Sequence, residues 1–202
     1  MSTLHPAGPT AAAVAELWWA MLAGAALIFL FVMALLALAF RRGGDGRGAQ
    51  SLWIIGLGLA FPLAVLAALL LWGLGLGERY LVPGRDDAPL VQAEARQWAW
   101  SFRYSGSSRA PTEGILLIPA GRPVDVEITS ADVIHSFWVP RLAGKLDAIP
   151  GHTNVLRLQA DTPGDYAGLS AEFSGPGYLG HRFTVRALEA DDWEAFLAGG
   201  ER

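Results

Sequence analysis

The chain contains no cysteine among its 202 residues, and its three methionines are confined to positions 1, 21 and 33. The absence of cysteine excludes disulfides, thiolate catalysis, thiolate metal ligands and a lipid anchor on cysteine. The chain also lacks a basic patch, and its net charge is −4. Nucleic-acid binding needs a concentration of Lys and Arg, so no nucleic-acid partner is expected.

Charge is scarce in the first part of the chain, where two long apolar runs occur. Residues 17–40 are 24 residues without a charge, and residues 51–77 form a second uncharged run. At 1.5 Å per residue a helix over the first run is about 36 Å long, enough to cross a hydrocarbon core of about 30 Å. A buried core helix or a signal peptide is the alternative for such a run, but the first run lacks a basic leader and is too long for a signal peptide. We therefore expect a transmembrane hairpin over residues 17–77.

The charges between the two runs predict the orientation of this hairpin. The loop 41–50 carries three Arg and one Asp, whereas the preceding segment 1–16 carries only Glu16. The positive-inside rule places the loop in the cytoplasm and both termini outside. The sequence thus predicts a multi-pass protein of the cell inner membrane with a periplasmic or equivalent extracytoplasmic C-terminal domain. We expect the outer segment 1–16 to be poorly ordered.

The remainder of the chain has the alternation of β-strands. After a charged linker at 78–89, residues 123–129 place Val, Val and Ile on one face and Asp, Glu and Thr on the other. Segments 97–104, 155–160 and 183–188 also suit strands, and Gly- and Pro-containing turns separate them. No alternation of strands with helices occurs. The pattern predicts an all-β Greek-key sandwich over 90–190, followed by a short C-terminal helix and tail at 191–202.

One loop has the layout of a metal site. Within 168–183 the polar side chains Ser170, Ser174, Tyr178 and His181 are separated by gaps of four, four and three, and His135 lies upstream in Asp-Val-Ile-His-Ser-Phe-Trp-Val-Pro. Hydroxyl and phenol groups are poor ligands at neutral pH, and two histidines do not make a tetrahedral site. The two histidines with Tyr178 remain an alternative site for one divalent ion. Otherwise we expect the loop's polar side chains to hydrogen-bond within the loop, since an unpaired buried hydroxyl costs about 1–3 kcal/mol.

This layout resembles the copper loop of subunit II of haem-copper terminal oxidases, Cys-x-Glu-x-Cys-x-x-x-His-x-x-Met with a further upstream His. The resemblance covers about residues 17–188 and implies a cupredoxin-like domain. Ser170 and Ser174 stand at the positions of the bridging cysteines, Tyr178 at that of the His and His181 at that of the Met. His135 and Glu172 keep the family's residues. The segment Phe-Ser-Gly-Pro-Gly-Tyr looks like the copper-free loop of bo-type ubiquinol oxidases.

The resemblance has several implications for site residues, cofactors and partners. Two bridging thiolates are needed for the family's binuclear copper centre, so no redox-active cofactor is expected in this chain. Glu172 would be a ligand of a magnesium or manganese ion shared with subunit I. Trp98 matches the family's electron-entry position, without copper behind it. The partners would be subunit I, which holds the haems and copper, other oxidase subunits, the lipid membrane, and quinol through subunit I.

The expected function is that of a non-catalytic subunit II of a respiratory terminal oxidase that oxidises quinol, reduces oxygen and pumps protons in subunit I. One alternative is a cytochrome c oxidase or a nitric-oxide-reducing relative whose electrons enter elsewhere. Another is a stand-alone membrane-anchored cupredoxin that binds copper, against which the lack of Cys and of nearby Met counts.

Overall fold

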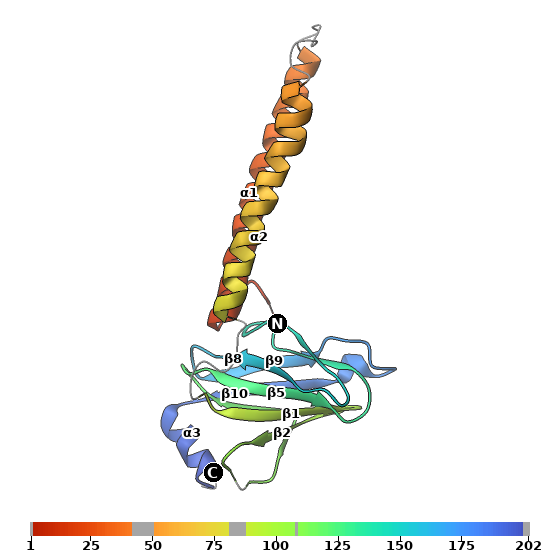
Figure 1. Ribbon diagram of the computed structural model, residues 1–202. Helices are drawn as coiled ribbons and strands as arrows, with labels where there is room; N and C mark the ends of the chain where they lie inside the picture. The colour runs from red at the N-terminus through yellow and green to blue at the C-terminus, as the bar shows by residue number, and fades with distance from the viewer. Residues whose placement is uncertain (1, 42–50, 81–87, 108, 200–202) are drawn as a thin grey trace. The chain divides into compact units, whose positions relative to one another are not determined.

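The computed structural model describes residues 2–41, 51–80, 88–107 and 109–199. The chain divides into two units (Figure 1). One unit combines Met1–Ala15 with Tyr80–Arg202, and the other consists of Glu16–Arg79. The chain therefore passes between the two units twice, at residues 15–16 and 79–80.

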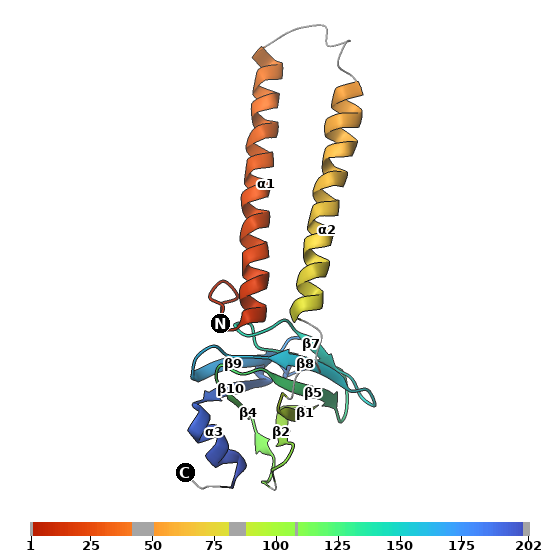
Figure 2. The ribbon, with the colours of Figure 1, turned by 60° about the vertical axis from the view of Figure 1, so that its left-hand side comes forward.

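The helical unit is built from α1 (Pro9–Arg41), a π-helical segment η1 (Leu52–Ala60) and α2 (Phe61–Tyr80). Figure 2 shows α1 and α2 running in opposite directions. Within each of the two continuous helices the most apolar stretch, with mean hydropathy 2.8 and 2.6, is not buried against the rest of the protein. The structure thus confirms two apolar helices long enough to cross a membrane. The π-helical winding ends just before Pro62, which has no N–H to donate to an α-helical partner.

The β-domain is a sandwich of two five-stranded sheets, in the orders β3-β2-β1-β5-β8 and β4-β10-β9-β6-β7. This confirms the β-sandwich prediction, and a short helix, α3 (Ala190–Leu197), follows the last strand as expected. The strands are β1 (Leu90–Arg96), β2 (Ala99–Tyr104), β3 (Thr112–Glu113), β4 (Ile115–Pro119), β5 (Val124–Ser130), β6 (His135–Trp138), β7 (Leu146–Ala148), β8 (Asn154–Leu158), β9 (Gly164–Ser170) and β10 (Arg182–Leu188).

The core between the sheets is rich in aromatic rings. Alternate residues of β2 point inward, so that Trp100, Phe102 and Tyr104 are buried. Trp100 packs against Phe137 and Phe183 of the opposite sheet, with ring centres 5.4 Å away in each case. Burial of such rings dominates the stability of a small sandwich. The core therefore reaches the end of the sandwich where the candidate site lies.

The N-terminal segment differs from the expectation of poor order. The Ala7 N–H donates to the Arg141 carbonyl at 2.8 Å, and the Asp161 N–H donates to the Ala7 carbonyl at 2.9 Å. Helix α1 begins at Pro9, eight residues before the uncharged run, because proline suits the first position of a helix. The segment is held by partners distant in sequence, which no local pattern reveals.

Candidate functional site

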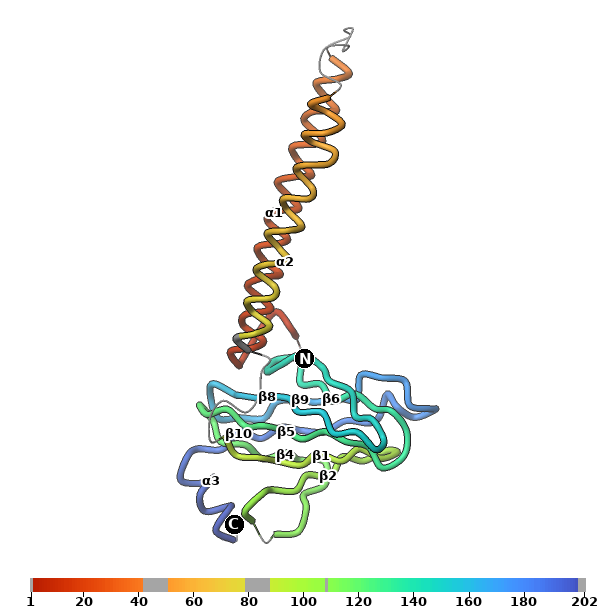
Figure 3. Tube along the Cα trace, viewed as in Figure 1, coloured from red at the N-terminus to blue at the C-terminus, as the bar shows by residue number. Residues whose placement is uncertain are grey.

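Three loops meet at one end of the sandwich, where Figure 3 shows the blue β9–β10 loop extending outward. The β1–β2 turn contacts the β5–β6 loop through the Gln97 N–H, which donates to the Asp132 carboxylate at 2.7 Å. The Gln97 side-chain amide donates to the Ser174 carbonyl in the β9–β10 loop at 2.6 Å. These bonds join segments about 35 and 77 residues apart in sequence. The predicted site residues are thus drawn from separate loops into one region.

His135 and His181 lie in contact at the centre of this region. Both side chains are fully buried, with ring centres 4.9 Å apart and planes at 79°. His135 Nε2 lies 2.8 Å from Asp132 Oδ1 and donates to this carboxylate, while His135 Nδ1 has no hydrogen-bond partner. Trp100 stacks on the His181 ring at 5.5 Å. The sequence placed these two histidines at one site, and the structure brings them together.

The polar atoms around the histidines are largely unpaired. Ser170 Oγ accepts a bond at 3.3 Å from the Ser136 N–H of strand β6, which lies outside the loop. Among buried side-chain atoms of the described residues, the following at this site have no hydrogen-bond partner: His135 Nδ1, His181 Nδ1 and Nε2, Ser136 Oγ and Ser174 Oγ. The expectation that all loop side chains pair locally is therefore wrong for Ser174 and His181. The bonds at these two residues are made by their backbones: the Ser174 carbonyl accepts the Gln97 amide, and the His181 carbonyl accepts the Ser170 N–H.

Tyr178 and Glu172 lie outside this buried cluster. Tyr178 begins a short 3-10 turn, η2 (Tyr178–Gly180), and its half-buried ring packs against Phe173 at 5.3 Å. The Glu172 carboxylate is 44% exposed, accepts the Phe173 N–H at 3.1 Å and lies 4.0 Å from Lys145 Nζ. The predicted site residues therefore form two groups, a buried histidine–serine cluster and a surface carboxylate.

The donor set of the buried cluster does not fit a thiolate-bridged pair of copper ions. Its groups are two imidazoles and serine hydroxyls, and a hydroxyl stays protonated at neutral pH and cannot replace a bridging thiolate. Within the described ranges no group of three or more His, Asp or Glu residues is arranged to hold a metal ion. The cluster is a group of buried polar side chains without the ligands for such a copper pair.

Trp98 occupies a different place from the one that strand alternation indicated. It lies in the two-residue turn between β1 and β2, outside the strand, and its side chain is 39% exposed. Gly175 and Gly177 adopt φ values of 116° and 113°, and a Cβ at either would lie 3.3 or 3.1 Å from the Trp98 ring. These glycines let the loop cover one side of the indole.

The pKa values of His181 and Asp132 are both shifted from their ordinary values. Desolvation lowers the pKa of His181, and the nearby His135 adds to this effect, while the Ala99 backbone opposes it. Burial would raise the pKa of Asp132, but hydrogen bonds from the Gln97 N–H, from His135 and from the Val133 N–H lower it to about 2. The cluster therefore contains an ionised carboxylate beside an uncharged His181 near neutral pH.

The lowered pKa of His181 predicts acid sensitivity of the β-domain. Because the unfolded state protonates His181 near pH 6.5 and the folded state only at lower pH, the free energy of unfolding should fall as the pH drops below about 6.5. The Asp132 contribution is lost in a separate window, between its ordinary pKa of 3.8 and about 2. The free energy of unfolding is measured by urea unfolding of the purified chain at several pH values. His181→Phe should reduce its fall below about pH 6.5, whereas the control His152→Ala, on an exposed turn, should leave that fall unchanged. Equal slopes in all three proteins would contradict the assignment.

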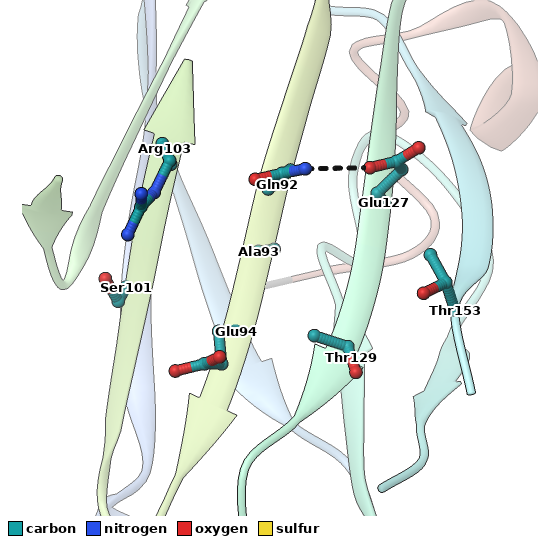
Figure 4. A pocket seen from close by; sticks show the side chains of 8 residues that line it. All are labelled: Gln92, Ala93, Glu94, Ser101, Arg103, Glu127, Thr129 and Thr153. Carbon is teal, nitrogen blue, oxygen red and sulfur yellow. Dashed lines mark hydrogen bonds between the residues drawn. The ribbon is translucent and has the colours of Figure 1, made fainter. Parts of the chain in front are cut away.

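A depression lies on the outer face of the sheet β3-β2-β1-β5-β8 (Figure 4). It is lined by polar side chains of β1, β2, β5 and the start of β8: Gln92, Glu94, Ser101, Arg103, Glu127, Thr129 and Thr153, with Ala93 at its floor. Its one internal bond runs from the Gln92 amide to the Glu127 carboxylate at 3.2 Å. Polar side chains of this kind are typical of a solvent-exposed sheet face, and none of them belongs to the histidine–serine cluster.

Comparison with known proteins identifies the β-domain. Residues 109–186 match the family model described as cytochrome c oxidase subunit II, periplasmic domain. The chain is 38% identical over 114 residues to cytochrome c oxidase subunit 2 of Alkalihalophilus pseudofirmus, covering 56% of this chain and 33% of that protein. The β-domain is similar to the periplasmic domain of subunit II of haem-copper oxidases.

Relatives of both donor types occur among the similar proteins. The ubiquinol oxidase subunit 2 of Acetobacter aceti is 38% identical over 107 residues, covering 53% of this chain and 34% of that protein. The chain thus spans about a third of the length of these curated relatives. The crystal structure of the periplasmic domain of subunit II of cytochrome oxidase of Bradyrhizobium japonicum superposes with a TM-score of 0.55 at 23% identity, over 59% of this chain and 96% of that one. That likeness confirms the cupredoxin-like fold.

Proposed function

We propose that the chain is a non-catalytic subunit II of a respiratory terminal oxidase that has no binuclear copper centre and oxidises quinol. The observation that carries this proposal is the donor set at the loop, where Ser170 and Ser174 flank two buried histidines in a chain without cysteine. Without thiolates, electrons have no redox centre to enter in this domain. A donor that reaches subunit I directly from the membrane, such as quinol, is consistent with this loss.

The proposed role is anchoring and covering of the catalytic subunit. Helices α1 and η1–α2 would span the inner membrane, with loop 41–50 in the cytoplasm and the β-domain in the periplasm. Exposed apolar side chains next to the site, Ile134, Phe173 and Leu179, are available for contact with subunit I. Subunit I would hold the haems and copper, reduce oxygen and pump protons.

The second candidate is a subunit II whose complex accepts electrons from cytochrome c or reduces nitric oxide, with electron entry elsewhere. His135 with its Asp132 support, Glu172 and the segment 145–150 look more like the cytochrome c branch, and one relative carries that name. A stand-alone copper-binding cupredoxin is disfavoured by the donor set described above.

The donor is tested with the purified complex. We expect oxygen consumption with reduced quinol and none with reduced cytochrome c, and we expect Trp98→Phe to leave the quinol rate unchanged because no copper lies behind Trp98. Rapid oxygen consumption with cytochrome c that Trp98→Phe leaves unchanged would contradict the proposal and favour the second candidate. A many-fold slowing by Trp98→Phe would show that electrons enter through this domain and would contradict both candidates.

We also propose that Glu172 is a ligand of a magnesium or manganese ion shared with subunit I. Its carboxylate is half-exposed beside the site, and a single carboxylate completed by a partner's groups and water is an ordinary magnesium arrangement. Within this chain the Glu172 carboxylate forms a weak ion pair with Lys145 Nζ at 4.0 Å, and the metal ion would have to displace that pairing.

A complex from cells grown with manganese tests this role. Glu172→Gln should abolish the spin signal of the bound manganese and lower oxygen reduction only modestly, because the carboxylate holds a non-redox ion. Glu194→Gln, which alters an exposed carboxylate on α3, is the control and should leave the signal intact. An unchanged signal in Glu172→Gln would show that this carboxylate is not a ligand.

A further inference from the structure

The β9–β10 loop, residues 172–180, is held against the β-domain at few points. Among the described residues, one hydrogen bond joins this loop to a residue outside 170–182: the Gln97 side-chain amide donates to the Ser174 carbonyl at 2.6 Å. Ser174 is also the one buried residue of the loop, and its other residues are half-buried or exposed. The loop is therefore fixed to the domain chiefly at Ser174.

The Trp98 indole lies against the same part of the loop. The backbone passes so close to this ring that a Cβ at Gly175 or Gly177 would lie 3.3 or 3.1 Å from it. The Glu172 carboxylate and Lys145 Nζ are 4.0 Å apart, and such a pair between half-exposed side chains contributes little. The two residues of the β1–β2 turn thus supply both the amide bond and the indole contact that hold the loop.

The side chains beneath the loop are polar and poorly paired. Within the described part of the chain, Ser174 Oγ, His135 Nδ1 and both ring nitrogens of His181 are buried without a hydrogen-bond partner. An unpaired buried group is destabilising relative to the same group in water, so a movement of the loop that admits water would relieve this cost at several atoms together. Displacing the loop should therefore require less free energy than unfolding the sandwich.

We propose that residues 172–180 form a lid over the buried pair His135 and His181, and that Gln97 and Trp98 are the latch that holds this lid closed. The lid opens while both sheets stay folded, because β9 and β10 remain paired with each other and with their other neighbours. The open lid gives water and dissolved ions access to two imidazoles that the closed lid buries. The lid lies wholly within the β-domain and works in the same way with either electron donor.

The absence of cysteine makes thiol labelling of the full, detergent-solubilised chain a direct test of lid opening. Ser174→Cys places a thiol on the buried side of the lid, Ser105→Cys on an exposed turn, and Ala187→Cys in the core on β10. A water-soluble maleimide should label Ser174→Cys at least about tenfold more slowly than Ser105→Cys and at least about tenfold faster than Ala187→Cys. A Ser174→Cys rate equal to either reference rate would overturn the proposal.

The latch is tested in the Ser174→Cys background. Gln97→Ala removes the amide bond to the lid and should raise the labelling rate about threefold to tenfold, and Trp98→Ala should raise it as well. Gln92→Ala is the matched control, because its amide bond lies on the outer face of the sheet, and it should leave the rate unchanged.

A core variant separates lid opening from loss of overall stability. Val124→Ala lies at the end of β5 far from the β5–β6 loop, so it should weaken the sandwich and leave the Ser174→Cys rate unchanged. Circular dichroism checks that every variant keeps its strands. Unchanged rates in both Gln97→Ala and Trp98→Ala would contradict the latch, and an equal increase in Gln92→Ala or Val124→Ala would contradict a separate movement of the lid.

Discussion

A chain carrying Ser170→Cys, Ser174→Cys, Tyr178→His and His181→Met should turn purple when copper is added. Ser170 ends strand β9 and Ser174 is buried in the following loop, so both new thiolates would lie inside the domain next to His135. His135 is already prepared as a ligand, because Asp132 holds its Nε2 at 2.8 Å and its Nδ1 has no partner. A carboxylate behind a ligating histidine is the usual support of a metal site.

The controls for this restoration follow from the need for two bridging thiolates. The same variant without Ser174→Cys keeps one thiolate and should give no mixed-valence spin signal. The full chain is the proper sample, since residues 5–11 form part of the domain. A folded quadruple variant that stays colourless in the presence of copper would show that the loop lacks the family's geometry.

Trp100→Ala should destabilise the β-domain by about 3–5 kcal/mol, the usual range for removing a fully buried tryptophan. Its side chain is fully buried and packs against Phe102, Phe137 and Phe183 as well as both site histidines. The loss removes contacts from both sheets and from the loop site at once. Urea unfolding of the purified chain, followed by circular dichroism of the strands, measures the change.

Trp98→Ala is the matched control for this core substitution. The Trp98 ring is 39% exposed, and its ring contact with a buried residue is an edge-on one to His181 at 6.2 Å, so its removal should cost about 1 kcal/mol or less. Similar losses in the two variants would show that the aromatic core does not carry the stability of the sandwich.

The repeating parts of the fold could be predicted from the sequence. Uncharged runs indicated the two helices, and alternation in 123–129 matched β5, where Val124, Val126 and Ile128 are buried. The spacing of Ser170, Ser174 and His181, with His135 upstream, indicated residues that the structure buries in one region, whereas Tyr178 lies outside that cluster. These features depend on local periodicity and spacing, which a single sequence displays.

Contacts between distant segments could not be predicted in this way. The docking of Ala7 between Arg141 and Asp161 depends on two loops more than 130 residues away. The position of Trp98 outside the strand depends on where the β1–β2 turn falls, with Arg96 paired to Ala99. Whether Ser174 and His181 find hydrogen-bond partners depends on the packed core. Each of these is a tertiary effect that overrides or adds to the local pattern.

The central claim is that this chain carries no redox copper, and copper loading of the unmodified full chain tests it most directly. The purified protein, incubated with copper and freed of excess metal, should be colourless and should lack the mixed-valence spin signal of a thiolate-bridged pair. The reason is that serine hydroxyls stand where two thiolates are required, in a chain without cysteine. A purple protein with that spin signal would contradict the account.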